Sequence, residues 1–191
     1  EKGTLPNMPK VGISMQIPKE FDAMTWFGRG PHENYLDRKS SAKVDIYSGK
    51  VSDQIHPYIR PQESGNKTDV RWATFRNVAG DGLLVRGLLS LNASHYLQED
   101  YDHGFGEIKS GATGNIKTTK QQRHSIDMVE RELINLDIDL IQMGLGGEDS
   151  WWAQPLEKYQ IKPKNYDYSF TLMPIKSDEN PVELNKNAFL K

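Results

Sequence analysis

Apolar and polar residues alternate along most of the chain, a pattern typical of strands with one buried face. In the segment Val11–Ile17 the apolar side chains alternate with Gly12, Ser14 and Gln16, until Pro18 stops the run. The same alternation recurs in Ile134–Leu140 and in Tyr166–Leu172. Weaker strand candidates are Ala23–Phe27, Lys43–Tyr47, Val70–Asn77, Leu83–Leu89 and Leu156–Ile161. The pattern therefore predicts many short strands.

Helical signals are few. Ser94 is placed to cap one short helix that runs to about Tyr101. The segment Ser125–Leu133 fits either one helical face or a strand–turn–strand unit, and we favour the latter because the polar run 130–132 breaks it. Two glycine-bearing stretches, Pro57–Thr68 and Asp102–Lys120, are predicted to be long loops.

Short strands, frequent turn signals and few helices together indicate an all-β sandwich of antiparallel sheets. The sequence contains no internal repeat and no linker that would divide it. We therefore predict one domain over residues 1–175, followed by a polar, loosely held tail over residues 176–191.

Composition and charge narrow the possible functions. Of the 191 residues, 36% are hydrophobic and 26% are charged, as in an ordinary soluble domain. A net charge of −2 without a basic block gives no reason to expect nucleic acid or a membrane as partner. The absence of cysteine excludes disulfides, thiolate zinc sites and cysteine nucleophiles, and it leaves the cellular compartment undetermined. Because the sequence begins at Glu1 without an initiator Met, we expect a fragment of a longer protein.

Familiar catalytic motifs are missing. The Gly144–Gly147 run follows a predicted strand, as a dinucleotide fingerprint would, but Asp149 occupies the third glycine position and no helix is predicted after it. The five histidines are scattered without metal-ligand spacing. Neighbouring Glu148 and Asp149 point apart on an extended chain, so they do not make the carboxylate pair of a glycosidase, which lies about 5–10 Å apart.

Three polar clusters that contain glycine stand out: Gly28–Arg38, Tyr58–Trp72 and Gln142–Trp152. In the first cluster, glycines and a proline allow a tight change of direction, and charged and amide side chains can brace a buried loop. The third cluster has three glycines in four residues and ends in two tryptophans. Such glycines permit turns and close backbone approach.

The two indole rings allow two interpretations. An indole face can stack on the apolar face of a pyranose, with Asp149 and Ser150 bracing the loop that presents it. Alternatively, Trp151 and Trp152 both plug the mouth of the sandwich, and composition alone favours this second interpretation.

Taken together, four motifs in this order resemble the C-terminal domain, also called the small chain or fifth domain, of glycoside hydrolase family 2 β-galactosidases. The motifs are Met8–Gly12, Trp26–Arg38, Pro61–Trp72 and Gln142–Trp151. The resemblance extends from about Leu5 to about Pro174. It implies a galactose-mutarotase-like supersandwich of antiparallel sheets. The family's domain is longer, so we expect this chain to lack its first strands, and the loop Asp102–Lys120 looks longer than usual.

The resemblance also implies how the active site is shared. In this family the two catalytic glutamates and the principal Mg²⁺ ligands lie in a separate (β/α)₈ barrel, so no catalytic residue, metal or cofactor is expected on this chain. The family tryptophan that closes the G-G-x-D-S-W motif is an aromatic platform for the aglycone, which implies this role for Trp151. The supporting loop would consist of Gly144, Gly146, Gly147, Asp149 and Ser150.

The main hypothesis is therefore a non-catalytic domain that completes the active site of a retaining β-galactosidase. Its expected partners are the rest of that polypeptide and a galactoside such as lactose, and a homo-oligomeric parent stays open. The first two clusters are interpreted as structural braces. Two alternatives also stay open: a stand-alone carbohydrate-binding module, and an aldose-1-epimerase-like enzyme that would need a histidine and a carboxylate converging in the concave sheet.

Overall fold

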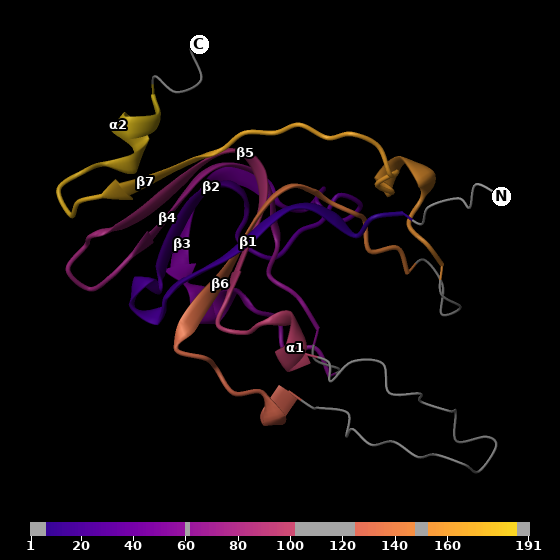
Figure 1. The fold of residues 1–191 in the computed structure, drawn as a ribbon, viewed down its shortest axis with the longest axis horizontal. Coiled ribbons are helices and arrows are strands. Elements are labelled where there is room, and N and C mark those ends of the chain that lie inside the picture. Colours follow the sequence, from indigo (N-terminus) through magenta and orange to yellow (C-terminus); the bar gives the residue numbers. More distant parts are fainter. Residues whose placement is uncertain (1–6, 60–61, 102–124, 148–152, 187–191) are drawn as a thin grey trace.

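The computed structural model describes residues 7–59, 62–101, 125–147 and 153–186, and strands dominate it (Figure 1). The strands are β1 (Lys10–Pro18), β2 (Ala23–Gly30), β3 (Lys43–Lys50), β4 (Lys67–Arg76), β5 (Gly82–Ser94), β6 (Leu133–Gln142) and β7 (Thr171–Ile175). Two short α-helices are α1 (Gln98–Tyr101) and α2 (Pro181–Asn185). Single 3₁₀ turns lie at Lys19–Phe21, Val51–Gln54, Ser125–Asp127 and Glu157–Tyr159. The predicted all-β, antiparallel fold is confirmed. None of the helices in these ranges is long and apolar enough to cross a membrane.

All seven strands belong to one antiparallel sheet. Its order is β1-β6-β5-β4-β2-β3, and β7 pairs with β5 beside this path. The long strand β5 joins two regions of the sheet. Residues 82–86 pair with both β4 and β7, whereas residues 90–94 pair with β6.

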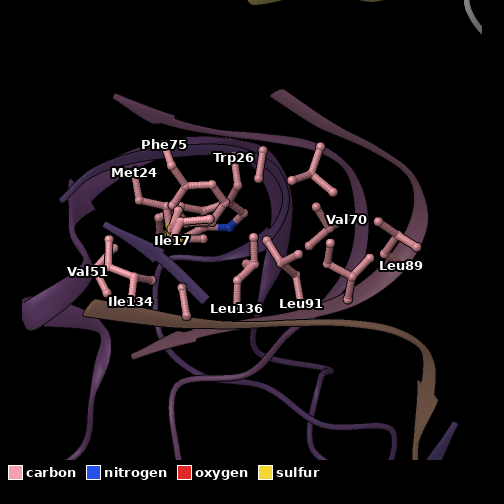
Figure 2. Packing of buried hydrophobic residues seen from close by; sticks show 14 residues of the cluster. Ile17, Met24, Trp26, Val51, Val70, Phe75, Leu89, Leu91, Ile134 and Leu136 are labelled. Carbon is pink, nitrogen blue, oxygen red and sulfur yellow. The ribbon is translucent and has the colours of Figure 1, made fainter. Parts of the chain in front are cut away.

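The sheet curls so that β1 and β6 face β2 and β4 across one hydrophobic core (Figure 2). The alternation predicted from the sequence decides which side chains enter it. In β6, Ile134, Leu136 and Ile138 are fully buried in the core, while Asn135 and Asp137 lie on the opposite face. Because burial of a large apolar side chain contributes about 1.5–3 kcal/mol, this face fixes the register of the strand.

A second apolar cluster lies on the outer face of the sheet, where Trp72, Leu84 and Ile175 are buried and Leu184 of α2 packs against them. Arg76 fastens the segment before α2, because its guanidinium donates hydrogen bonds to the carbonyls of Lys176 and Glu179. The predicted polar tail, residues 176–191, therefore includes a short helix that packs on the sheet. Its polar composition concealed one apolar anchor and a capped helix.

That cap is visible in the local geometry. The Asn180 side chain accepts a hydrogen bond from the Val182 N–H at 2.9 Å, and Pro181 opens the helix.

Several predicted strands are shorter or missing. The segment predicted as the strand Leu156–Ile161 forms a 3₁₀ turn and a single bridge to Met8. The strand predicted at Tyr166–Leu172 begins only at Thr171, although Tyr168 and Phe170 pack against the core. The alternation there reflects side-chain burial without a hydrogen-bonded ladder.

The other local differences concern helical signals. Ser125–Leu133 contains a 3₁₀ turn before β6 and no strand–turn–strand unit. Ser94 accepts a hydrogen bond from the Tyr96 N–H, but the helix starts later, at Gln98. The predicted loop Pro57–Thr68 ends slightly earlier because β4 begins at Lys67. The loop predicted at Asp102–Lys120 lies outside the described residues.

Candidate functional site

The glycine loop after β6 has a tightly packed base. The Gly144 N–H donates to the Tyr159 carbonyl at 2.9 Å. A Cβ atom at Gly144 would lie only 2.8 Å from the Asp37 carboxylate and 2.9 Å from Tyr159, so only glycine fits there. Just before it, the Met143 N–H donates to the Pro9 carbonyl. The loop base is therefore wedged between the N-terminal segment and Asp37.

Gly146 and Gly147 complete the hydrogen bonds at the base of the loop. Gly146 has φ +69° and Gly147 has φ +83°, left-handed conformations that side-chain-bearing residues rarely adopt. The Gly146 N–H donates to Asp37 Oδ2 at 2.8 Å, and the Gly147 N–H donates to the Ala153 carbonyl at 3.3 Å. The chain thus leaves this base at Gly147 and returns to it at Ala153. The predicted supporting residues Asp149 and Ser150, and Trp151 itself, lie outside the described residues, so their roles stay predictions.

Asp37 connects this loop to the cluster Gly28–Arg38, which contains a cis Gly30–Pro31 peptide bond. Its Oδ2 atom accepts the Gly146 hydrogen bond, while its Oδ1 atom is buried without a hydrogen-bond partner among the described residues. The structure therefore joins the first and third clusters through one carboxylate.

Glu33 joins the first and second clusters. Its carboxylate accepts hydrogen bonds from three donors: the hydroxyls of Tyr35 and Tyr58, and the Gly65 N–H at 2.8 Å. Burial, with the Glu33 charge adding to it, raises the pKa of Tyr35 and keeps that hydroxyl a donor. These bonds fix the loop between β3 and β4 against the first cluster.

A fully buried amide pair reinforces this connection. Asn34 Oδ1 accepts from both the N–H and the hydroxyl of Thr68, at 2.8 and 2.6 Å. The Asn66 side chain donates to the Asn34 carbonyl and accepts from the Ser90 hydroxyl. Because both buried amides are hydrogen-bonded on either side, this pair rigidifies the loop.

An ion pair fixes the start of β4. Arg29 donates to Asp69 and to the Ala42 carbonyl, while Lys39 Nζ lies 3.2 Å from the same aspartate. Burial opposes ionisation of Asp69, but hydrogen bonds from Arg29 and Lys39 outweigh it and hold the pKa of Asp69 below its ordinary value. Asp69 has a left-handed φ of +54°.

Lys67 is a buried cation in the same region, only 1% exposed. Its ammonium donates to the Gly65 carbonyl at 2.8 Å and lies 5.2 Å from the centre of the Trp26 ring. Burial lowers the pKa of Lys67 to about 8, although the nearby Glu33 charge opposes this shift. Nothing in its sequence context signals such deep burial.

All three clusters therefore form one hydrogen-bonded network at one side of the sheet. The contacts made by Glu33, Asn34 and Asp37 agree with the interpretation of the first two clusters as braces. Sequence reasoning missed Asp37 as the specific residue that holds the glycine loop. Its only signal is a position in the Gly28–Arg38 motif.

A separate group of charged residues lies on the face of β6 that points away from the hydrophobic core. Lys10 Nζ contacts Asp137 Oδ2 at 2.8 Å and Glu63 Oε1 at 3.5 Å. Asp139 is 2% exposed on the same face. Burial raises the pKa of Asp139 to about 7; Lys10 opposes this shift, and the charges of Asp137 and Glu63 add to it. Within the described ranges, no group of three histidine or acidic residues is arranged to hold a metal ion.

The epimerase hypothesis requires a free histidine beside a carboxylate. His95 does contact Asp22, with Nε2 3.0 Å from Oδ1, but its Nδ1 lies 2.8 Å from the Leu133 carbonyl and the ring is 2% exposed. Both ring nitrogens are therefore engaged inside the protein. This pair has the geometry of a structural contact.

Comparison with known proteins gives the same family over nearly the whole chain. The family model described as beta galactosidase small chain matches residues 1–172. A beta-galactosidase of Priestia megaterium is 39% identical over 178 residues, which cover 90% of this chain and 15% of that protein. The beta-galactosidases of Pseudoalteromonas haloplanktis and Vibrio cholerae are 35% and 32% identical, each over 88% of this chain and 14% of the relative.

The chain thus spans about 15% of the length of the curated relatives it matches. The match includes the Gly28–Arg38 cluster, the Glu33 and Asn34 braces and the glycine loop that Asp37 holds. The chain therefore belongs to the β-galactosidase small-chain family.

Proposed function

We propose that this chain is a non-catalytic domain of a retaining β-galactosidase and that it contributes an aromatic aglycone platform, Trp151, to an active site built mainly by a (β/α)₈ barrel elsewhere in the parent protein. The parent would hydrolyse terminal β-D-galactosides such as lactose. Its relatives carry the name beta-galactosidase, and the small-chain family is shown for this chain.

The observation that carries the proposal is the built base of the glycine loop. Asp37 holds Gly146, Tyr159 holds Gly144, and Gly147 bonds to Ala153 on the returning chain. A platform must keep its ring in place before the sugar arrives, because ordering a loose loop on binding costs free energy. The three bonds give the loop a base of this kind on both sides of the segment 148–152.

The cofactor proposal concerns the parent protein. Mg²⁺ would be held mainly by residues of the barrel, and two carboxylates described here already form ion pairs within this chain. Asp69 binds Arg29 and Lys39, and Asp137 binds Lys10. The residues of this chain would position the aglycone and exclude water around it, while proton transfer and nucleophilic attack take place on the barrel.

One experiment on the parent enzyme tests the platform. Trp151→Ala should raise KM for lactose about tenfold, since a lost aromatic contact of about 1.4 kcal/mol corresponds to this factor. Inhibition by free galactose should change much less, because the platform contacts the aglycone. Trp152→Ala is the matched control and should leave both values near those of the wild type. A Trp151→Ala enzyme with unchanged KM and unchanged transfer to a glucose acceptor would disprove the platform.

The isolated chain separates this proposal from the alternatives. It should not hydrolyse a nitrophenyl β-galactoside, whereas measurable turnover would show that it holds its own catalytic groups. It should also not interconvert the anomers of galactose, which an epimerase-like enzyme would do.

A further inference from the structure

We infer that the polar face of β1, β6 and β5 forms a second saccharide-binding groove, which takes a neutral sugar. This inference goes beyond the platform and does not rest on it. It starts from the strand register. Ser14 pairs with Asp137 and Asp137 with Asn92, while Gln16 pairs with Asn135 and Asn135 with Ser94.

The register thus lays two rows of three polar side chains across neighbouring strands. The alternate residues of the same strands point to the other face of the sheet, where they are buried in the hydrophobic core. Cross-strand neighbours lie about 4.5–5.5 Å apart, so the rows form a flat polar floor. Hydrogen bonds hold this floor in place: Ser14 donates to Asn135 at 2.9 Å, and the Ser94 hydroxyl lies 3.0 Å from the Tyr101 hydroxyl.

This polar floor lines a groove on the surface of the protein. This groove of about 890 Å³ is lined by both rows, by Lys10 at the start of β1, by Glu63 from the loop before β4, and by Tyr96 beside α1. This volume lies in the range of about 300–1,000 Å³ in which proteins hold small ligands. A smaller pocket shares Tyr96 and Tyr101 with the groove and adds His56 and Tyr58. The groove therefore combines amides, hydroxyls and carboxylates with aromatic rings.

One floor residue has unused hydrogen-bonding capacity. Asn92 is 4% exposed, and its Oδ1 atom has no hydrogen-bond partner among the described residues. Glu63 Oε1 is also buried without a hydrogen bond there, although Lys10 Nζ lies 3.5 Å away. Burying an amide oxygen without a hydrogen bond costs about 1–3 kcal/mol, so Asn92 favours a ligand with a hydroxyl donor.

The charges of the groove select against an anion. The single lysine in this lining, Lys10, is already paired with Asp137 at 2.8 Å and lies beside Glu63. A phosphate would therefore meet the carboxylates of Glu63, Glu99 and Asp137, and this lining offers it no free cation. A neutral sugar instead offers hydroxyls to the amide floor and an apolar ring face to Tyr96.

The test is an NMR titration of the full 191-residue chain with lactose. The amide signals of Asn92, Ser94 and Asn135 should shift together and saturate with a millimolar Kd. Galactose 6-phosphate should bind more weakly than galactose. Absence of saturable shifts at these residues up to the solubility limit of lactose would overturn the groove, as would tighter binding of the phosphorylated sugar.

Variants locate the binding. Tyr96→Ala and Gln16→Ala change partly or fully exposed side chains, so the fold should persist, and each should weaken lactose binding at least fivefold. Tyr166→Ala, a half-buried tyrosine elsewhere, is the matched control and should bind as the wild type does. Trp151→Ala should keep the groove signals. If Trp151→Ala abolishes the shifts while Tyr96→Ala does not, the groove is disproved and the platform survives.

Discussion

At the scale of single residues, Asn34 has an unusual number of partners for one side chain. It is fully buried, donates to the His32 carbonyl and accepts two hydrogen bonds from Thr68. Asn34 therefore ties the first cluster to the start of β4. Its role is structural, because the side chain is fully buried and its hydrogen bonds are made within the protein.

Asn34→Ala should lower the free energy of unfolding by about 3 kcal/mol, because it removes three hydrogen bonds and leaves the Thr68 N–H buried without a partner. Urea unfolding followed by circular dichroism measures this loss. Asn77→Ala is the control, since Asn77 makes one bond to the Ala79 N–H in an exposed turn and should cost less than about 1 kcal/mol. Equal losses in the two variants would contradict the bracing role.

Asp139 makes stability depend on pH. Its pKa is raised to about 7 in the folded protein by burial, and the unfolded value is near 3.8. The folded state therefore binds more protons than the unfolded state between these values. The contribution of Asp139 to the free energy of unfolding is fully present below about pH 4 and is lost as the pH rises to about 7.

Asp139→Asn should remove this decline, so the variant should gain stability relative to the wild type as pH rises from 4 to 7. The gain at pH 8 should be on the order of 4 kcal/mol, because each unit of the pKa difference between the folded and unfolded states corresponds to about 1.4 kcal/mol. Thermal unfolding at several pH values measures it. Asp53→Asn, which changes an exposed aspartate, is the matched control. A flat profile for Asp139→Asn would show that the residue titrates normally.

At the scale of elements, α2 is a cover for the outer apolar cluster. Residues 173–186 lie beyond the stretch matched by the family model, yet they shield Trp72 and Leu84. The Arg76 hydrogen bonds and the Asn180 cap hold this cover in place.

Leu184→Ala should lower the free energy of unfolding by about 1–2 kcal/mol, less than for a fully buried leucine because Leu184 is only partly buried. Val182→Ala on the same helix removes an exposed side chain and should change stability by less than about 0.5 kcal/mol. The midpoints of urea unfolding of the two variants test this prediction. Indistinguishable midpoints would show that Leu184 does not stabilise the outer apolar cluster.

Strand prediction succeeded where side-chain burial and ladder formation coincide. β6 has this property, because Ile134, Leu136 and Ile138 enter the core while the strand pairs on both sides. It failed at Leu156–Ile161, where Ile161 is buried but makes a single bridge. Alternation reports burial, and backbone pairing depends on partners far away in the sequence.

At the scale of the whole molecule, the sheet order could not be predicted from local pattern. β1 and β6 pair although about 120 residues separate them, and this choice depends on the fit of two complete faces. The same holds for the candidate site. The sequence identified the three clusters, but the contacts of Asp37 and Glu33 that unite them bridge 109 and 32 residues. Lys67 and the groove floor were missed for this reason.

The outer edge of the sheet also has a consequence for the whole molecule. β3 pairs only with β2 in the described sheet, and its exposed face carries Val44 and Ile46. Lys43 and Lys50 stand at the two ends of this strand. Charged residues at an edge discourage pairing with another chain, so these lysines favour solubility.

The bond between Gly147 and Ala153 gives the molecule a modular property. The chain leaves and re-enters the scaffold at one point, so the intervening segment 148–152 is a cassette whose ends are already joined. Replacing this segment with another of the same length does not change the distance between Gly147 and Ala153 that the segment must span. Substitutions in this segment therefore leave the scaffold that Asp37 supports unchanged.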